Sequence, residues 1–189
     1  MGIKIYLDQG HNPREFNTGA EGNGFFEQDI TYDIGVRLYR LLNNNPDFEV
    51  RLSRQTPNEV IGSNNSSSLT TRVNEANSWG ADVFISLHTN ASTNVNATGS
   101  EALVYSFSST VANELGRDIL EQLHLTTGLR NRGVKERPGL YVLRRTQMPA
   151  VLVEMGFITN PTDANLMAYS PNLFSEGIYR GILKYYNLL

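Results

Sequence analysis

Short apolar runs alternate with helical patterns along the whole chain. The run IKIYL at residues 3–7 alternates apolar and polar positions, as a half-buried strand does. From about Glu27 onward, apolar residues recur at helical spacing, and the NNNP stretch at 43–46 should end that helix. The same reasoning predicts strands at 48–53, 82–87, 101–107, 140–144 and 150–157, a helix capped by Ser68 that runs to Trp79, helices at 111–128 and from Pro171 onward, and polar loops at 9–24, 56–68 and 89–99.

Strands that alternate with helices favour an α/β fold. In such a fold we expect a mostly parallel sheet with helices on both faces. The chain has 189 residues, of which 40% are hydrophobic, and this is enough for one full-sized core. Because the sequence contains no internal repeat and no long linker, we expect a single domain over residues 1–189.

Charge and composition narrow the function classes. The formal net charge is −3 and the 16 basic residues are scattered, so neither nucleic acid nor an anionic membrane surface is the expected partner. There is no cysteine, and any metal site must therefore use His, Asp or Glu. We find no signal peptide at the N-terminus and no apolar run near the ~18 residues of a membrane span. The expectation is a protein that carries no export signal of its own.

Three predicted strands end in unusual polar residues. The first strand is followed by LDQGHNP, which contains His11, the run DVFISL leads directly into His88, and AVLV leads into Glu154. Ligands of open α/β sheets bind beyond the carboxyl ends of the strands. If these three strands are parallel, the three side chains share one edge of the sheet.

Two imidazoles and one carboxylate form a good ligand set for catalytic zinc, because a fourth position stays open. A metal hydrolase also needs a second, unligated carboxylate that moves a proton. Glu27 and Glu154 could divide these roles in either order, and the residues alone do not choose between them. A histidine at a strand end is more often a structural hydrogen-bonding residue than a ligand. His124, between two leucines of a predicted amphipathic helix, has that structural interpretation, as do the flanking acids Asp82, Glu101 and Asp163, although Glu101 could reach the cleft.

Several segments of the chain match a known family in order. They are LDQGHN, GFFEQD, TTRVNEAN, ADVFISLHTNA, GSEALVYS, NRGVKERPGLYVLRRTQMPAVLVEMGFITNPTD and GIYRGILKYY. Together they resemble the zinc-dependent N-acetylmuramoyl-L-alanine amidases (amidase type 3) of bacterial autolysins and phage endolysins. The resemblance spans nearly the whole chain. It implies a twisted, largely parallel sheet flanked by helices.

The resemblance also implies the roles of the site residues. His11, Glu27 and His88 would hold one Zn²⁺ per chain, and Glu154 would be the catalytic acid/base. The reaction implied is hydrolysis by zinc-activated water of the amide between N-acetylmuramic acid and L-alanine in peptidoglycan. The protein would act at the bacterial cell wall, after release from the cytoplasm or by signal-independent export. The chain departs from the family in DQGHNP, where DPGHGG is common, and it carries no recognisable wall-binding module.

Two other functions stay open beside the amidase. One is a different zinc peptidoglycan hydrolase on the same scaffold, such as a carboxypeptidase or deacetylase. The other is a non-catalytic wall-binding module, for which a missing ligand or base would be the sign; here all four positions are occupied. Asn90, two residues past His88, is our candidate for stabilising the oxyanion. The sequence does not indicate the oligomeric state or the peptidoglycan chemotype.

Overall fold

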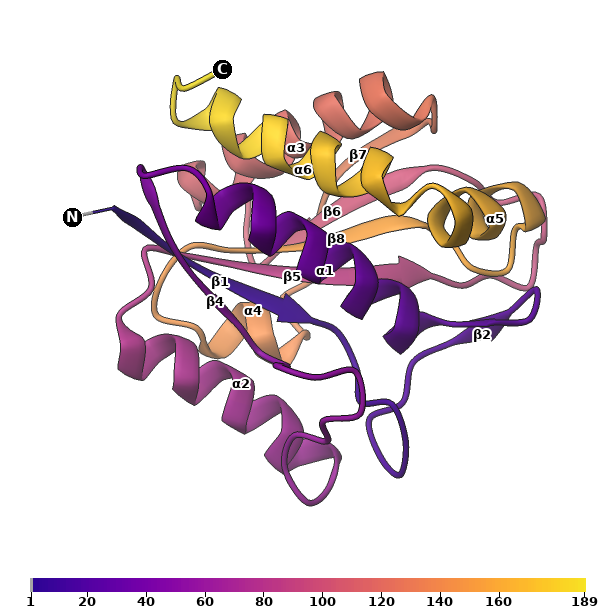
Figure 1. Ribbon diagram of the computed structural model, residues 1–189, viewed down its shortest axis with the longest axis horizontal. Coiled ribbons are helices and arrows are strands. Elements are labelled where there is room, and N and C mark those ends of the chain that lie inside the picture. Colours follow the sequence, from indigo (N-terminus) through magenta and orange to yellow (C-terminus); the bar gives the residue numbers. More distant parts are fainter. Residues whose placement is uncertain (1) are drawn as a thin grey trace.

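A six-stranded sheet runs through the centre of the computed structural model, which describes residues 2–189 (Figure 1). All neighbouring strands are parallel except β8 and β6, which are antiparallel. The predicted mostly parallel sheet is therefore confirmed. In spatial order the strands are β4 (Phe48–Leu52), β1 (Ile3–Gln9), β5 (Val83–Asn90), β8 (Ala150–Phe157), β6 (Ser100–Val104) and β7 (Asn131–Glu136).

Helices cover both faces of this sheet, as predicted. Three long helices and one shorter helix lie on the upper face in Figure 1, and two helices lie on the lower face. A short hairpin precedes the first helix. The upper helices are α1 (Glu27–Asn43), α3 (Thr110–Thr127), α5 (Pro161–Tyr169) and α6 (Pro171–Tyr185); the lower ones are α2 (Asn65–Trp79) and α4 (Tyr141–Arg145); the hairpin is β2 (Glu21–Gly22) with β3 (Phe25–Phe26).

The central strands are apolar on both faces, because each face is covered by helices. In β1, Ile5 and Leu7 enter the core beneath α1, α3 and α6, whereas Tyr6 enters the smaller core beneath α2 and α4. Tyr6 stacks on Phe84 of β5 with ring centroids 5.6 Å apart. Full burial of an apolar side chain such as Ile5, Leu7 or Phe84 stabilises the fold by about 1.5–3 kcal/mol. The alternation along each strand thus fixes which residues face the α2–α4 side.

The prediction of a strand at 140–144 is wrong, because this segment forms the short helix α4. Its Val142 and Leu143 are buried in the core next to α2, and the amide of Arg144 donates to the carbonyl of Leu140. A short apolar run fits a buried strand and a buried helical turn equally well, so its periodicity could not decide.

The start of α2 also differs from the prediction. The helix begins at Asn65 and its N-cap is Asn64, four residues before Ser68. Asn64 and Ser67 form a reciprocal capping box, and Ser68 lies buried inside the first turns. Strand β7, helix α5 and the β2–β3 hairpin were not predicted. No helix among residues 2–189 has the length and apolar character needed to cross a membrane.

Candidate metal and catalytic site

The carboxyl ends of β1, β5 and β8 bring the predicted site residues to one edge of the sheet. His88 lies in β5 directly beside Glu154 of β8, since the two are register partners. His11 follows β1, which is paired with β5 on its other side. Glu27 is the first residue of α1, and its side chain reaches the same place. The conditional expectation of a shared edge is therefore met by the geometry.

The Glu27 carboxylate lies between the two imidazole rings. Its Oε1 is 3.3 Å from His11 Nε2 and 3.0 Å from His88 Nδ1. The rings meet edge to face, with centroids 4.7 Å apart. One potential ligand atom from each of the three residues lies within 4.8 Å of the other two. Three donors therefore face a common point.

Glu27 is fixed by backbone donors as well as by the imidazoles. Its Oε1 accepts from the amide of Thr89 and its Oε2 from the amide of Ala20, both at 2.8 Å. Burial alone would raise the pKa of Glu27, but its hydrogen bonds with His11 and His88 outweigh that cost and hold the pKa well below its usual range. The positive end of the α1 dipole also favours an anion at this position. Glu27 is thus a permanent carboxylate.

His11 has the hydrogen bond that orients a metal-binding histidine. Its Nδ1 lies 3.2 Å from the carbonyl oxygen of Asn17, which fits a tautomer with the proton on Nδ1. Nε2 is then left to face Glu27. This carbonyl contact on the far ring nitrogen is typical of histidines that bind metals. His11 also has a positive φ of 69°, so the backbone here is strained.

Gly10 is needed for the close approach of the two histidines. A Cβ at this position would lie 2.5 Å from His88 Cε1 and 2.6 Å from the carbonyl oxygen of Leu87. The backbone oxygen could not move away without disturbing β5. The glycine in LDQGHNP therefore lets the backbone before His11 pass directly against His88.

The loop after His11 is held by Arg72, which was not predicted to matter, and by Asn12 of the LDQGHNP stretch. Arg72 of α2 forms a buried ion pair with Asp8 and donates to the carbonyl oxygens of Gln9 and His11. Asn12 is fully buried and exchanges hydrogen bonds with the backbone of Ile61. Arg72 also donates to the Asn12 side chain. The buried Asn12 side chain therefore ties the rim beside His11 to the loop that contains Ile61.

Glu154 lies beside this cluster without any hydrogen bond to its Oε2, which is buried and has no partner among residues 2–189. Its strand neighbours on the two sides are His88 and Glu101. Burial, and then the charges of Glu27 and Glu101, raise the pKa of Glu154 to about 8. A carboxyl group with such a pKa can accept and return a proton near neutral pH.

The other predicted polar residues have structural partners. His124 Nδ1 lies 2.8 Å from the carbonyl oxygen of Leu129, in keeping with its structural interpretation. Asp163 is more than a flanking acid, because it is fully buried and accepts from the amides of Gly99 and Phe157. Asn90 donates to Glu101 Oε1 at 3.1 Å. Its amide donor is thus already engaged away from the His11–Glu27–His88 cluster.

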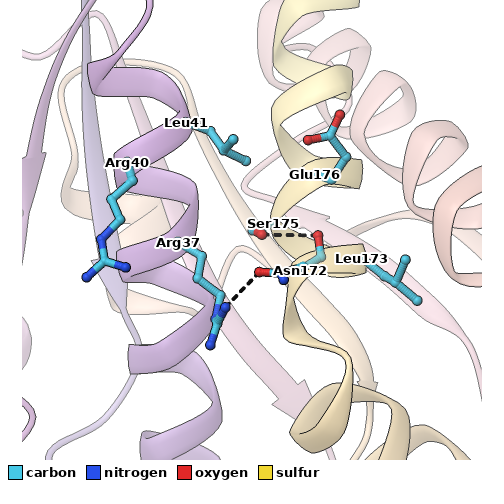
Figure 2. Close-up of a pocket in the computed structure, with 7 residues that line it drawn as sticks. All are labelled: Arg37, Arg40, Leu41, Asn172, Leu173, Ser175 and Glu176. Atoms are coloured by element: carbon cyan, nitrogen blue, oxygen red, sulfur yellow. Dashed lines mark hydrogen bonds between the residues drawn. The ribbon is translucent and has the colours of Figure 1, made fainter.

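A small cavity of about 110 Å³ adjoins the two histidines on the α2–α4 face, with Leu69, Tyr141 and Leu152 among its lining residues. A larger one, about 440 Å³, lies between α1 and α6 (Figure 2). In Figure 2, Arg37 of α1 donates to Asn172 of α6 across it. Arg37 is ten residues along α1 from Glu27, or roughly 15 Å. The larger cavity therefore contributes nothing to the site.

The residues fit a divalent metal of the zinc type. Two imidazoles and one carboxylate are a common catalytic zinc set, and the three donors converge without a cysteine. Glu27 neutralises half of the charge of such an ion. The Oε2 of Glu154 beside the cluster is buried without a hydrogen-bond partner among residues 2–189, so its capacity for a further hydrogen bond is unused.

Comparison with known proteins agrees with this geometry. A family model described as N-acetylmuramoyl-L-alanine amidase matches residues 5–184. The N-acetylmuramoyl-L-alanine amidase CwlM of Bacillus licheniformis is 38% identical over 95% of this chain and 65% of its own length. LytC, an amidase of the same description from Bacillus subtilis, is 36% identical over 98% of the chain and 36% of its own length. The chain thus spans less than two thirds of either curated relative.

A solved structure shows the same fold over the whole chain. The crystal structure of an N-acetylmuramoyl-L-alanine amidase from Clostridium difficile 630 superposes with a TM-score of 0.86 at 29% identity, covering 98% of this chain and 97% of the other. The family model, the curated relatives and the fold all indicate the same family. The chain belongs to the N-acetylmuramoyl-L-alanine amidase family, amidase type 3.

Proposed function

We propose that residues 1–189 form a catalytic domain that hydrolyses the amide bond between N-acetylmuramic acid and L-alanine in bacterial peptidoglycan. In this proposal one Zn²⁺ is held by His11, Glu27 and His88, and Glu154 is the acid/base. One observation carries it: a preformed His–Glu–His cluster lies one strand away from a carboxyl group with a raised pKa. Family membership supplies the substrate class.

The division of roles between the two glutamates follows from their surroundings. Glu27 is held by two imidazoles and two backbone amides and stays ionised, as a ligand must. Glu154 is not hydrogen-bonded through Oε2 and has a raised pKa, as suits a group that exchanges a proton. These surroundings support the proposal that Glu27 is the ligand and Glu154 the acid/base.

Zn²⁺ bound there would polarise the scissile carbonyl and lower the pKa of water. The contribution of the protein's own residues is proton transfer. As water adds to the carbonyl carbon, Glu154 accepts a proton from it and then delivers a proton to the amide nitrogen, so that nitrogen leaves as a neutral amine. The C–N bond breaks to give the lactyl carboxylic acid and the amine of L-alanine. The acid then loses its proton to the amine or to solvent, which leaves a lactyl carboxylate and a new L-alanine amino terminus.

The decisive experiment identifies the bond that is cut. Purified bacterial peptidoglycan is digested with the protein, the fragments are analysed by mass spectrometry, and the metal content of the same protein is measured. We expect new L-alanine amino termini and about one zinc per chain. Release of D-alanine would instead indicate a carboxypeptidase, and release of acetate a deacetylase. Wall binding without any released group would indicate a non-catalytic module.

A further inference from the structure

A cluster of opposite charges lies on the sheet immediately beyond Glu154. Its centre is Glu101 of β6, a buried residue that is the register partner of Glu154. Two cations of the edge strand β7 reach Glu101 Oε2: Arg132, whose Nε lies 2.9 Å away, and Lys135, whose Nζ forms a short ion pair. One carboxylate therefore faces two full positive charges, and one of these charges is left uncompensated.

The two cations are not equivalent. Arg132 also donates to the carbonyl oxygen of Thr98 and lies over the ring of Phe157, 5.0 Å from its centroid. It is fixed on three sides. The Lys135 side chain makes one hydrogen bond within residues 2–189, to Glu101, and a third of this side chain is exposed (34%). An ammonium group has three donors, so Lys135 can bind a second acceptor from solvent.

Lys135 lies on the same face of the sheet as the proposed site. It is in register with Leu103, which points to the α2–α4 side. Glu101, two residues before Leu103, points to that side as well, as does its partner Glu154. With strands about 4.8 Å apart, Glu101 is about 10 Å across the sheet from His88. The cations thus lie just past the position where the amide nitrogen would receive its proton.

We infer that Lys135, held on Glu101 beside Arg132, binds a carboxylate of the stem peptide and makes the enzyme prefer peptides that carry one. This inference rests on the proposed function. In peptidoglycan the residue after L-alanine is D-glutamate linked through its side chain, so its α-carboxyl group is either free or amidated. Two extended residues span about 7 Å, which carries this group from the scissile nitrogen beside Glu154 to the cations.

A purely structural ion cluster is the competing explanation, and it predicts a different result. If the cations only fix Glu101, their loss slows cleavage of every substrate in the same proportion. If Lys135 binds the substrate carboxylate, its loss slows only substrates that carry the carboxylate. The ratio between two substrates that differ in this group therefore separates the two explanations.

The test compares N-acetylmuramoyl-L-alanyl-D-glutamate with N-acetylmuramoyl-L-alanyl-D-isoglutamine, the γ-carboxyl group of both being blocked as the methylamide, so that the two substrates differ only in the α-carboxylate or α-amide. We expect the zinc-loaded wild type to cleave the carboxylate with a kcat/KM about tenfold higher, the size of one partly exposed charged hydrogen bond. Lys135→Gln should reduce this ratio to about two or less and leave the amide substrate nearly unaffected, whereas Lys135→Arg should keep most of the preference. Lys184→Gln, which removes a lysine paired with Asp118 and Glu121 on distant helices, should match the wild type.

Binding of the matching γ-methylamide dipeptides, L-alanyl-D-glutamate and L-alanyl-D-isoglutamine, measured by calorimetry, gives a readout that needs no cleavage. A preference for the carboxylate that depends on Lys135, without any cleavage, would support the inference and contradict the proposed function. Cleavage of both substrates at equal rates would support the proposed function and contradict the inference. A Lys135→Gln variant that slows both substrates equally would also overturn the inference, and the absence of cleavage and of binding would overturn both.

Discussion

Glu154 is the residue on which the proposed chemistry depends. Replacing it by Gln keeps its size and removes its ability to exchange a proton. We expect Glu154→Gln to lower the rate of peptidoglycan hydrolysis roughly 10²–10⁴-fold, the usual contribution of general acid–base catalysis. The zinc content, measured on the same preparation, should not change, because the three proposed ligands are untouched. Wild-type lysis by this variant would show that the base has been assigned to the wrong residue.

The raised pKa of Glu154 has a consequence for stability that can be measured without metal. Because the native state keeps this proton up to about pH 8, whereas an unfolded Glu releases it near pH 4.3, ionisation disfavours the fold between these values. Wild-type stability relative to Glu154→Gln should therefore fall as the pH rises from 5 to 9, by up to ~4 kcal/mol. Urea unfolding at both pH values in a chelator measures this difference. An equal stability difference between the wild type and Glu154→Gln at pH 5 and at pH 9 would contradict the raised pKa.

The sequence indicates the reactive residues better than the residues that hold them. His11, His88 and Glu154 are conspicuous because polar groups follow apolar strands directly. Arg72 was not identified, because an arginine in a helical pattern is usually exposed, and its partner Asp8 lies 64 residues earlier in the chain. Only the tertiary structure brings these two side chains together. Supporting residues of this kind depend on contacts that no local pattern encodes.

At the scale of elements, the same ion pair joins α2 to β1 beneath the site. Arg72 and Asp8 are both fully buried, and Ser86 adds a hydrogen bond to Asp8. Arg72→Met removes one partner and leaves a buried carboxylate, which should destabilise the fold by about 3–5 kcal/mol.

A matched control is Arg37→Met on α1. Arg37 is paired with Asp33 one turn away and also donates to Asn172 of α6, and both contacts are at least partly exposed to solvent. Loss of this ion pair should lower the free energy of unfolding by less than about 1 kcal/mol. Urea titration of both variants measures the two costs. A similar small cost for both would mean that the buried pair does not anchor α2.

The elements that were not predicted share a physical cause. Strand β7 is polar because it is an edge strand with no fully buried residue, so it lacks an apolar pattern. Helix α5 has a clear start signal in Asn160 and Pro161, but its weak amphipathic pattern gives it no apolar stripe. The long helices and central strands were predictable because burial imposes a period on them. Where burial is one-sided or slight, that signal is absent.

At the scale of the whole molecule, the order of the strands is what assembles the site. The three proposed ligands, residues 11, 27 and 88, come together only because β1 and β5 are adjacent and parallel and α1 begins at the same edge. The sequence predicted a shared edge only on condition that the strands were parallel. Neither strand order nor the antiparallel β6 could be inferred, since strand patterns do not specify their neighbours.

This assembly links metal binding to folding. The unfolded chain holds the three proposed ligands far apart and should bind zinc weakly, so zinc should stabilise the native state. At a free zinc concentration 100 times Kd, the gain is about 2.7 kcal/mol, which raises Tm by several degrees.

Thermal unfolding with and without zinc measures this gain, and a chelator should reverse it. His88→Gln should abolish the shift in Tm. His124→Gln is the matched control: among residues 2–189 the side chain of this histidine is hydrogen-bonded to the carbonyl of Leu129 through Nδ1 and not to Glu27, so the variant should lose some stability yet keep the full shift with zinc. A shift that survives in His88→Gln would place the metal elsewhere. A shift lost in both variants would indicate non-specific binding to histidine, because only one of these two side chains faces Glu27.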